Sequence, residues 1–123
     1  MAQVIGEIFT KDEADKKYGN VVKSIQLDVA VLKSLMAKTQ DSIMFNIRDD
    51  EVIILGDGRK ALYPAGAVVG NNEVFNRYSV SKVVELLNGG TGATVEIEER
   101  DEVLSITYGQ NTLEFSAPCP PLC

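Results

Sequence analysis

Histidine and tryptophan are both absent from this 123-residue sequence, and cysteine occurs only twice. The absence of histidine removes the commonest general acid–base residue and the commonest metal ligand among side chains. Cys119 and Cys123 lie close together at the end of the sequence, a spacing unlike the paired ligand knuckles of zinc sites. We expect free thiols in a reducing compartment, with a disulfide across Pro120 and Pro121 as the alternative.

Long hydrophobic runs are also missing. Every apolar run is far shorter than the roughly 20 residues that a membrane-spanning helix needs. The first residues lack a basic stretch followed by an apolar one, so we expect no signal peptide. The sequence therefore predicts a cytoplasmic protein with no membrane partner.

Positive charge is scarce, with 12 Lys and Arg against 18 Asp and Glu and a formal net charge of −6. This balance repels nucleic acid as a whole, although the basic residues could still gather on one face. Apolar residues make up 45% and charged residues 24% of the chain, an ordinary globular composition. The length and composition predict one domain over 1–123 with a core of its own.

Hydrophobic periodicity predicts three helices. Thr10 and Glu13 have capping-box spacing and Gly19 is a plausible stop, which predicts a short, mostly solvated helix over 11–18. A helical apolar stripe follows Asp28 and predicts a helix over about 29–38. A third helix begins after Ser79 or Ser81 and ends at 88–90.

Alternation of apolar and polar residues, clearest over 42–48 and 94–98, predicts strands between and after these helices. Each of the last two helices is followed by three strands joined by tight turns, typical of an antiparallel meander. The predicted strands are 42–48, 52–55, 59–63, 94–98, 102–108 and 112–116, with extended segments at 4–9, 20–25 and 73–78.

The two halves of the sequence have the same order of elements. Asp50-Glu51-Val52 corresponds to Asp101-Glu102-Val103, and Gly58 to Gly109, both at an offset of 51 residues. We interpret this as an internally duplicated helix-plus-antiparallel-strand unit, which predicts an α+β fold. The expected division is an N-terminal extension (1–23), repeat one (24–70), repeat two (71–118) and a tail (119–123).

The stretches Ser24 to Leu32, Phe45 to Val52 and Leu104 to Ser116 give this pattern a recognisable form. The order of elements over 24–118 resembles one domain of the bacterial DNA polymerase sliding clamp, a DNA clamp-like fold. The resemblance implies a ring of several copies whose helices carry basic residues toward DNA. It makes Lys33, Lys38 and Lys82 on the helices, together with Arg77, the DNA-facing candidates.

A wider basic set could contact phosphates if the fold brought it to one face. The alternative is that these residues are solvated turn and strand-edge charges, with Arg48 and Arg59 paired locally to Asp49, Asp50 or Asp57. The set consists of Arg48, Arg59, Lys60, Arg77 and Lys82.

Other chemical patterns are weaker. Gly56-Asp57-Gly58 resembles part of a phosphate loop, but it joins two predicted strands and we interpret it as a hairpin turn. Glu96 and Glu98 alternate with apolar residues on one strand, so we expect both to face solvent. We assign no catalytic residue, no metal ligand and no small-molecule cofactor.

These observations favour a non-enzymatic clamp-like binding or scaffold module. We expect it to form an oligomer or to bind other proteins, in either case through its sheet edges. The first alternative is a subunit of a DNA-encircling processivity clamp, and the second is a small enzyme of unrecognised type. The proline-rich tail could bind a partner, could pack over a groove of its own domain, or could be a frayed terminus.

Overall fold

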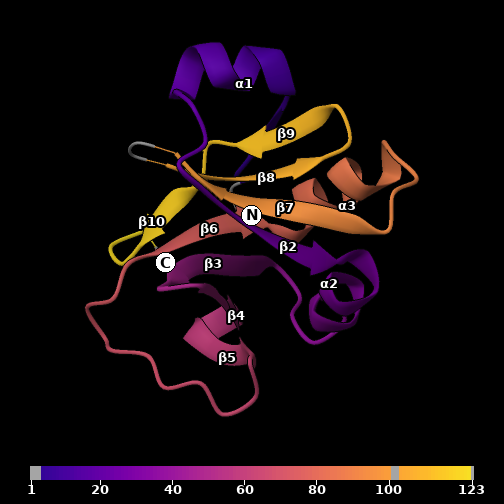
Figure 1. The fold of residues 1–123 in the computed structure, drawn as a ribbon. Helices are drawn as coiled ribbons and strands as arrows, with labels where there is room; N and C mark the ends of the chain where they lie inside the picture. The colour runs from indigo at the N-terminus through magenta and orange to yellow at the C-terminus, as the bar shows by residue number, and fades with distance from the viewer. Residues whose placement is uncertain (1–3, 101–102, 123) are drawn as a thin grey trace.

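Two five-stranded antiparallel sheets and three α-helices make up the computed structural model, which describes residues 4–100 and 103–122 (Figure 1). Sheet A has the strand order β1-β9-β8-β7-β2, and sheet B has the order β10-β6-β3-β4-β5. The predicted α+β class is confirmed. In chain order the elements are β1 (Glu7–Thr10), α1 (Lys11–Tyr18), β2 (Lys23–Asp28), α2 (Val29–Met36), β3 (Ser42–Arg48), β4 (Glu51–Gly56), a 3-10 turn (Asp57–Arg59), β5 (Lys60–Tyr63), β6 (Phe75–Ser79), α3 (Val80–Asn88), β7 (Thr94–Glu99), β8 (Leu104–Tyr108), β9 (Asn111–Glu114) and β10 (Ala117–Cys119).

Each sheet combines strands from both halves of the chain. The predicted meanders β3-β4-β5 and β7-β8-β9 are present, and each lies inside one sheet. The strand before each helix pairs with the meander of the other half: β2 with β7, and β6 with β3. The periodicity of the sequence gave no indication of this exchange, because it predicts strands but not their distant partners.

The main core lies between the two sheets and the helices α2 and α3, which Figure 1 shows on the same side of the molecule. Leu32 of α2, Val83 of α3, Phe45 of β3 and Ile97 of β7 are completely buried there. Tyr78 crosses this core from β6, and its hydroxyl donates hydrogen bonds to backbone carbonyls of β8 and β9 at 2.5 and 3.3 Å. The hydroxyl of a buried tyrosine thus ties sheet B to sheet A.

The outer faces of the two sheets are covered differently. On sheet B a second apolar cluster, which includes Met44, Leu55 and Phe75, packs against residues of the connection between β5 and β6. On sheet A the outer face is polar, and α1 lies over β9 on this side (Figure 1). The N-terminal helix therefore covers mainly polar side chains of the sheet.

The predicted helix over 11–18 is confirmed, including its cap. Thr10 Oγ1 accepts a hydrogen bond from the Glu13 amide, and the Glu13 carboxylate accepts one from the Thr10 amide. The reciprocal bonds satisfy two backbone donors that a helix N-terminus otherwise leaves open. Only Ala14 of this helix is buried as a whole residue, in agreement with the predicted solvated character.

The structure differs from the sequence expectations at Cys119 and at Glu98. Cys119 is disulfide-bonded and completely buried, whereas we expected a free thiol; Cys123 lies outside the described residues. Glu98 is only 4% exposed, whereas we expected it to face solvent beside Glu96. The alternation correctly placed both glutamates opposite the core, but α1 lies over this part of the outer face, and its Lys11 is 3.8 Å from the Glu98 carboxylate.

Helices of the length and apolar character needed to cross a membrane are not found among the described residues.

Candidate binding groove between the chain ends

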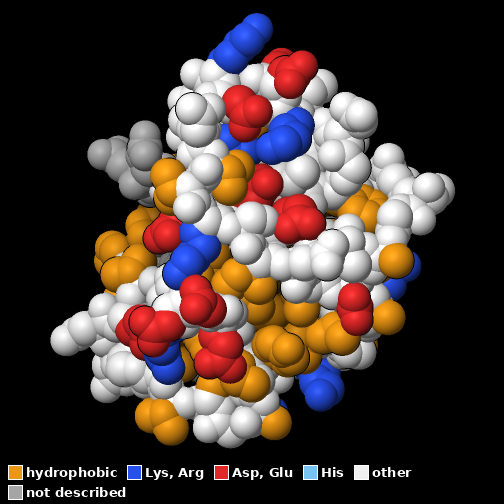
Figure 2. Space-filling view, viewed as in Figure 1, with side chains coloured by type: hydrophobic (Ala, Val, Ile, Leu, Met, Phe, Trp, Pro, Cys, Tyr) orange, Lys and Arg blue, Asp and Glu red, His pale blue; other side chains and the backbone are white. Residues whose placement is uncertain are grey.

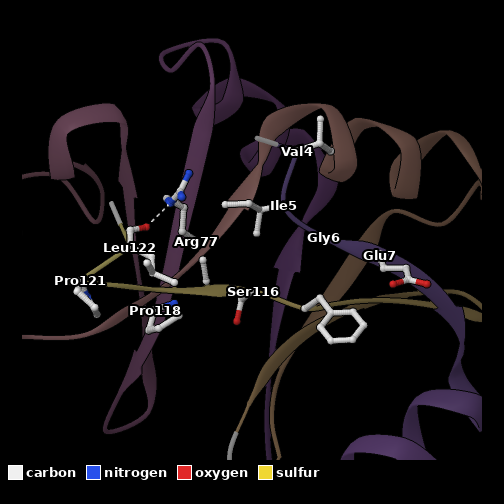
Figure 3. Close-up of a pocket in the computed structure, with 11 residues that line it drawn as sticks. Val4, Ile5, Gly6, Glu7, Arg77, Ser116, Pro118, Pro121 and Leu122 are labelled. Carbon is white, nitrogen blue, oxygen red and sulfur yellow. Dashed lines mark hydrogen bonds between the residues drawn. The ribbon is translucent and has the colours of Figure 1, made fainter. Parts of the chain in front are cut away.

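An open cavity lies where segments from the N-terminal and C-terminal parts of the chain meet (Figure 3). It has a volume of about 580 Å³ and is open to solvent, and we call it the terminal groove. Glu7 lies at one end in Figure 3, and Pro121 and Leu122 lie at the other. Its walls are formed by Val4, Ile5, Gly6, Glu7, Arg77, Phe115, Ser116, Ala117, Pro118, Pro121 and Leu122.

The N-terminal wall is a segment that changes sheets. The Ile5 amide donates to Ser79 Oγ at 2.7 Å, and the Ser79 amide donates to the Ile5 carbonyl at 2.9 Å. Ile5 is therefore bound to the last residue of β6, in sheet B. Gly6 has a φ of +125°, and the chain then joins β9 of sheet A as β1. A side chain at Gly6 would adopt a disfavoured backbone and would lie 3.0 Å from Leu113 Cδ1, so glycine is required.

The C-terminal wall makes the opposite change of sheet. After β9 in sheet A, Phe115 takes a φ of +64° and the chain enters sheet B as β10. A bulky side chain is uncommon at positive φ, and such strain is frequent at binding sites. The tail then folds back: the Leu122 amide donates to the Pro118 carbonyl at 2.8 Å, and Arg77 Nε donates to the Leu122 carbonyl at 2.7 Å.

Large apolar side chains remain exposed on both walls. Val4 is 60% exposed, Phe115 50% and Leu122 55%, although each is of a type that folding normally buries. Exposed apolar residues that gather around a groove are typical of a binding surface. The groove is therefore the candidate functional site.

Beside the groove, α1 covers a buried charged cluster centred on Arg100. This arginine is 1% exposed, and its guanidinium donates to the Asp15 carboxylate at 2.7 Å and to the Gly19 carbonyl at 2.5 Å. It also contacts Glu98 at 3.3 Å and Ser105 Oγ at 2.9 Å. Because these bonds join the β7–β8 turn to the helix and its end, Arg100 holds the N-terminal extension on sheet A.

Glu114 of β9 is the unsatisfied member of this region. It is completely buried, and neither of its carboxylate oxygens has a hydrogen-bond partner among the described residues. Burial is the main reason why its pKa rises to about 7. A buried group with such a pKa is more frequent at functional sites than elsewhere.

The structure places the four DNA-facing candidates in different surroundings. Lys33 of α2 and Lys38, just after it, are exposed. Lys82 of α3 forms an ion pair with Glu85 at 2.9 Å, and Arg77 lines the terminal groove instead of a helix surface. On the face shown in Figure 2, acidic and basic side chains are interspersed.

Arg48 and Arg59 have partners that we did not expect. Arg48 binds the Glu73 carboxylate at 2.5 Å, and Arg59 donates to the backbone carbonyls of Cys119, Gly70 and Glu73 at 2.6 to 3.1 Å. The predicted pairing with Asp49, Asp50 or Asp57 is wrong for both. Asp57 instead accepts three backbone amide hydrogen bonds from residues 40–42, and it thereby holds the loop before β3.

Most residues of the groove and the cluster were missed by the sequence analysis. The groove joins segments from both ends of the chain, and no local motif marks it. Arg100 and Glu114 lie in a turn and a strand whose polar residues, judged from the sequence, are expected to face solvent. The one available signal was the short charged helix with its strong cap, since a charged helix that is held firmly can cover a polar face.

Comparison with known protein families, curated proteins and solved structures finds no match for this chain. Within the described residues there is also no group of three or more histidine, cysteine or acidic side chains arranged to hold a metal ion.

Proposed function

We propose that the chain is a non-enzymatic, clamp-like scaffold module that acts through protein–protein contacts. The exchanged strands support the duplicated, clamp-like part of this proposal. Equivalent bonds occur at the two helix starts: the Val29 amide donates to the Ala93 carbonyl, and the Val80 amide to the Asp41 carbonyl, both at 2.9 Å. Two related units that exchange their first strands would produce this correspondence.

The terminal groove carries the binding part of the proposal, because exposed apolar residues flank it on both sides. The neighbouring sheet edge is a poorer contact surface. Pro118 in β10 has no amide hydrogen, and its carbonyl already accepts from Leu122, so this edge offers few groups for pairing with another strand. We therefore place the protein contact at the groove.

A second copy provides the first test, since a symmetric dimer would bring the same apolar residues of two copies together. We expect the apparent mass in sedimentation to rise above 13.4 kDa with concentration. The double substitution Val4→Asp, Leu122→Asp should weaken this association by at least about tenfold, because charged side chains are disfavoured in an interface core.

Val68→Asp is the matched control. Val68 is 84% exposed and lies outside the groove, so this variant should associate like the wild type. A wild-type chain that stays monomeric at all concentrations would remove the second copy as the partner. Equal weakening by both variants would contradict the placement of the contact at the groove.

The ring that encircles DNA remains the alternative, supported by the position of α2 and α3 on one side of the molecule (Figure 1). With a net charge of −6, we expect duplex DNA to bind more weakly than about 100 µM at physiological salt. Fluorescence anisotropy of a labelled duplex measures this. Tighter, salt-dependent binding that disappears when Lys33, Lys38 and Lys82 are all changed to Glu would instead favour the ring.

A further inference from the structure

Three aromatic rings gather at the junction of the groove and α1. They are Phe9 of β1, Tyr18 of α1 and Phe115. The ring centroids are 5.7 to 6.1 Å apart, and the interplanar angles of 47° to 85° set the rings at steep angles to one another. We call this group the aromatic cage.

A lysine ammonium group occupies this cage. Lys17 Nζ lies 5.0 Å from the ring centroids of Phe9 and Phe115 and 5.8 Å from that of Tyr18. All three distances are within the range of cation–π attraction. Among the described residues Lys17 has no hydrogen-bonded or ion-paired partner, so the rings are the main attraction that holds its charge here.

The charges behind the cage also favour a cation. Burial and the negative charges of Glu114 and Glu7 raise the pKa of Tyr18. The Tyr18 hydroxyl and both oxygens of Glu114 are buried without a hydrogen-bond partner in the described part of the chain. When Glu114 is ionised, above about pH 7, its negative charge stabilises a positive charge in front of these groups.

The occupant is poorly matched to this site in one respect. An ammonium group of lysine has three N–H donors and is strongly hydrated, yet the cage gives those donors no acceptor. An alkylated ammonium group has fewer donors or none and loses less hydration when rings surround it. Its methyl groups also contact the ring faces directly.

We propose that the aromatic cage binds alkylated ammonium groups and that Lys17 is its displaceable resident. The cage shares Phe115 with the terminal groove, and Glu7 lines that groove as well. A ligand can therefore place its ammonium head in the cage and an apolar body in the groove. This inference is independent of the proposed self-association, because it concerns a different occupant.

The test compares the wild type with Lys17→Gln, which removes the resident charge from an exposed helix position without a poor helix former. Choline is the probe, and chemical shifts of the ring and backbone signals report binding. We expect Lys17→Gln to bind choline at millimolar concentrations and the wild type at least about tenfold more weakly, because the tethered lysine competes. The neutral analogue 3,3-dimethylbutanol should bind Lys17→Gln at least about tenfold more weakly than choline, since it lacks the charge.

Phe115→Ala in the Lys17→Gln background should abolish choline binding, and the dispersed amide spectrum will show whether the variant is folded. Equal binding of choline and its neutral analogue would overturn the proposal, as would the absence of choline binding to a folded Lys17→Gln. Lys17 would then be a structural contact only.

The source of the ammonium group is distinguished with a short apolar peptide that contains trimethyllysine. Binding of this peptide at least about tenfold tighter than choline would assign the site to a modified protein segment that also fills the groove. Equal affinities would assign it to a free alkylated ammonium compound. Val68→Asp in the Lys17→Gln background is the control, since Val68 is exposed and lies outside the groove and the cage, and it should leave choline binding unchanged.

Discussion

Replacing Arg100 with methionine should lower the free energy of unfolding by about 3–5 kcal/mol, the cost of breaking a buried ion pair from one side. Methionine fills similar space but donates no hydrogen bond. Glu98 would keep its charge inside the protein, with the hydroxyl of Thr107 and the more distant Lys11 as its remaining contacts. The Asp15 carboxylate and the Gly19 carbonyl would lose their links to sheet A. Urea denaturation measures the loss, and amide exchange should show faster opening of residues 11–18.

Arg48→Met is the control for this substitution. Arg48 also pairs with a glutamate, but its side chain is 40% exposed, so its loss should cost less than about 1 kcal/mol. Adding Glu98→Gln to Arg100→Met should recover part of the lost stability, because it removes the uncompensated charge. Equal effects of Arg100→Met and Arg48→Met would contradict the structural role assigned to Arg100.

Replacing Glu114 with glutamine should stabilise the protein at pH 8 and change little near pH 4.5. The pKa of Glu114 rises from 4.5 to about 7 on folding, chiefly because of burial. A raised carboxyl pKa means that the folded state holds the proton more tightly. The stability contributed by this group is therefore fully present below about pH 4.5 and is lost as the pH rises through about 7. The whole loss is about 3 kcal/mol.

The charged neighbours of Glu114 come from several elements. Glu98 raises its pKa, and the nearby Ser105 hydroxyl and the charge of Arg100 lower it. Glu7 is opposite Glu114 in the β1–β9 register. The charge of Glu114 contributes to the raised pKa values of Tyr18 in α1 and Tyr78 in β6, after burial as the main cause. Glutamine carries two N–H donors into this site, which reduces the expected gain at pH 8 to about 1–3 kcal/mol.

The stability that is lost at low pH comes from other carboxyl groups, so it can be told apart from the loss that Glu114 causes at high pH. The hydrogen bond from Arg100 lowers the pKa of Asp15, and that from Arg48 lowers the pKa of Glu73. These carboxylates stabilise the fold above their ordinary pKa values and lose that contribution as the pH falls. Thermal unfolding between pH 4 and 9 measures both sides. If the stability of Glu114→Gln follows the wild-type pH dependence above pH 5, the raised pKa of Glu114 is wrong. Glu51→Gln changes an exposed residue and is the control; its stability should follow the wild-type pH dependence throughout.

Local elements were predictable because their signals are local. The Thr10–Glu13 cap, the apolar stripes of α2 and α3 and the alternation in β3 and β7 each depend on residues within a few positions of one another. The tight turns predicted both meanders for the same reason. The duplication and the resemblance to a clamp domain support the proposed function and stay predictions.

The pairing of distant segments and the covering of surfaces were not predictable in this way. The exchange of β2 and β6 depends on which strand edges meet, and the alternation of a single strand does not contain that information. Glu98 is buried beside α1, where Lys11, more than 80 residues earlier in the chain, lies 3.8 Å from its carboxylate. The aromatic cage and the groove likewise join both ends of the sequence, so each of their residues looks ordinary in its own segment.

The exchange of strands also fixes an order of events during synthesis. The strands β3, β4, β5 and β6 of sheet B can pair once residue 79 has left the ribosome. Sheet A has to wait, because β2 ends at residue 28 and its partner β7 begins at residue 94, and β1 needs β9, which is later still. Contacts of such long separation slow folding. During synthesis, β2 therefore remains without its partner until β7 has left the ribosome, and β1 until β9 has done so.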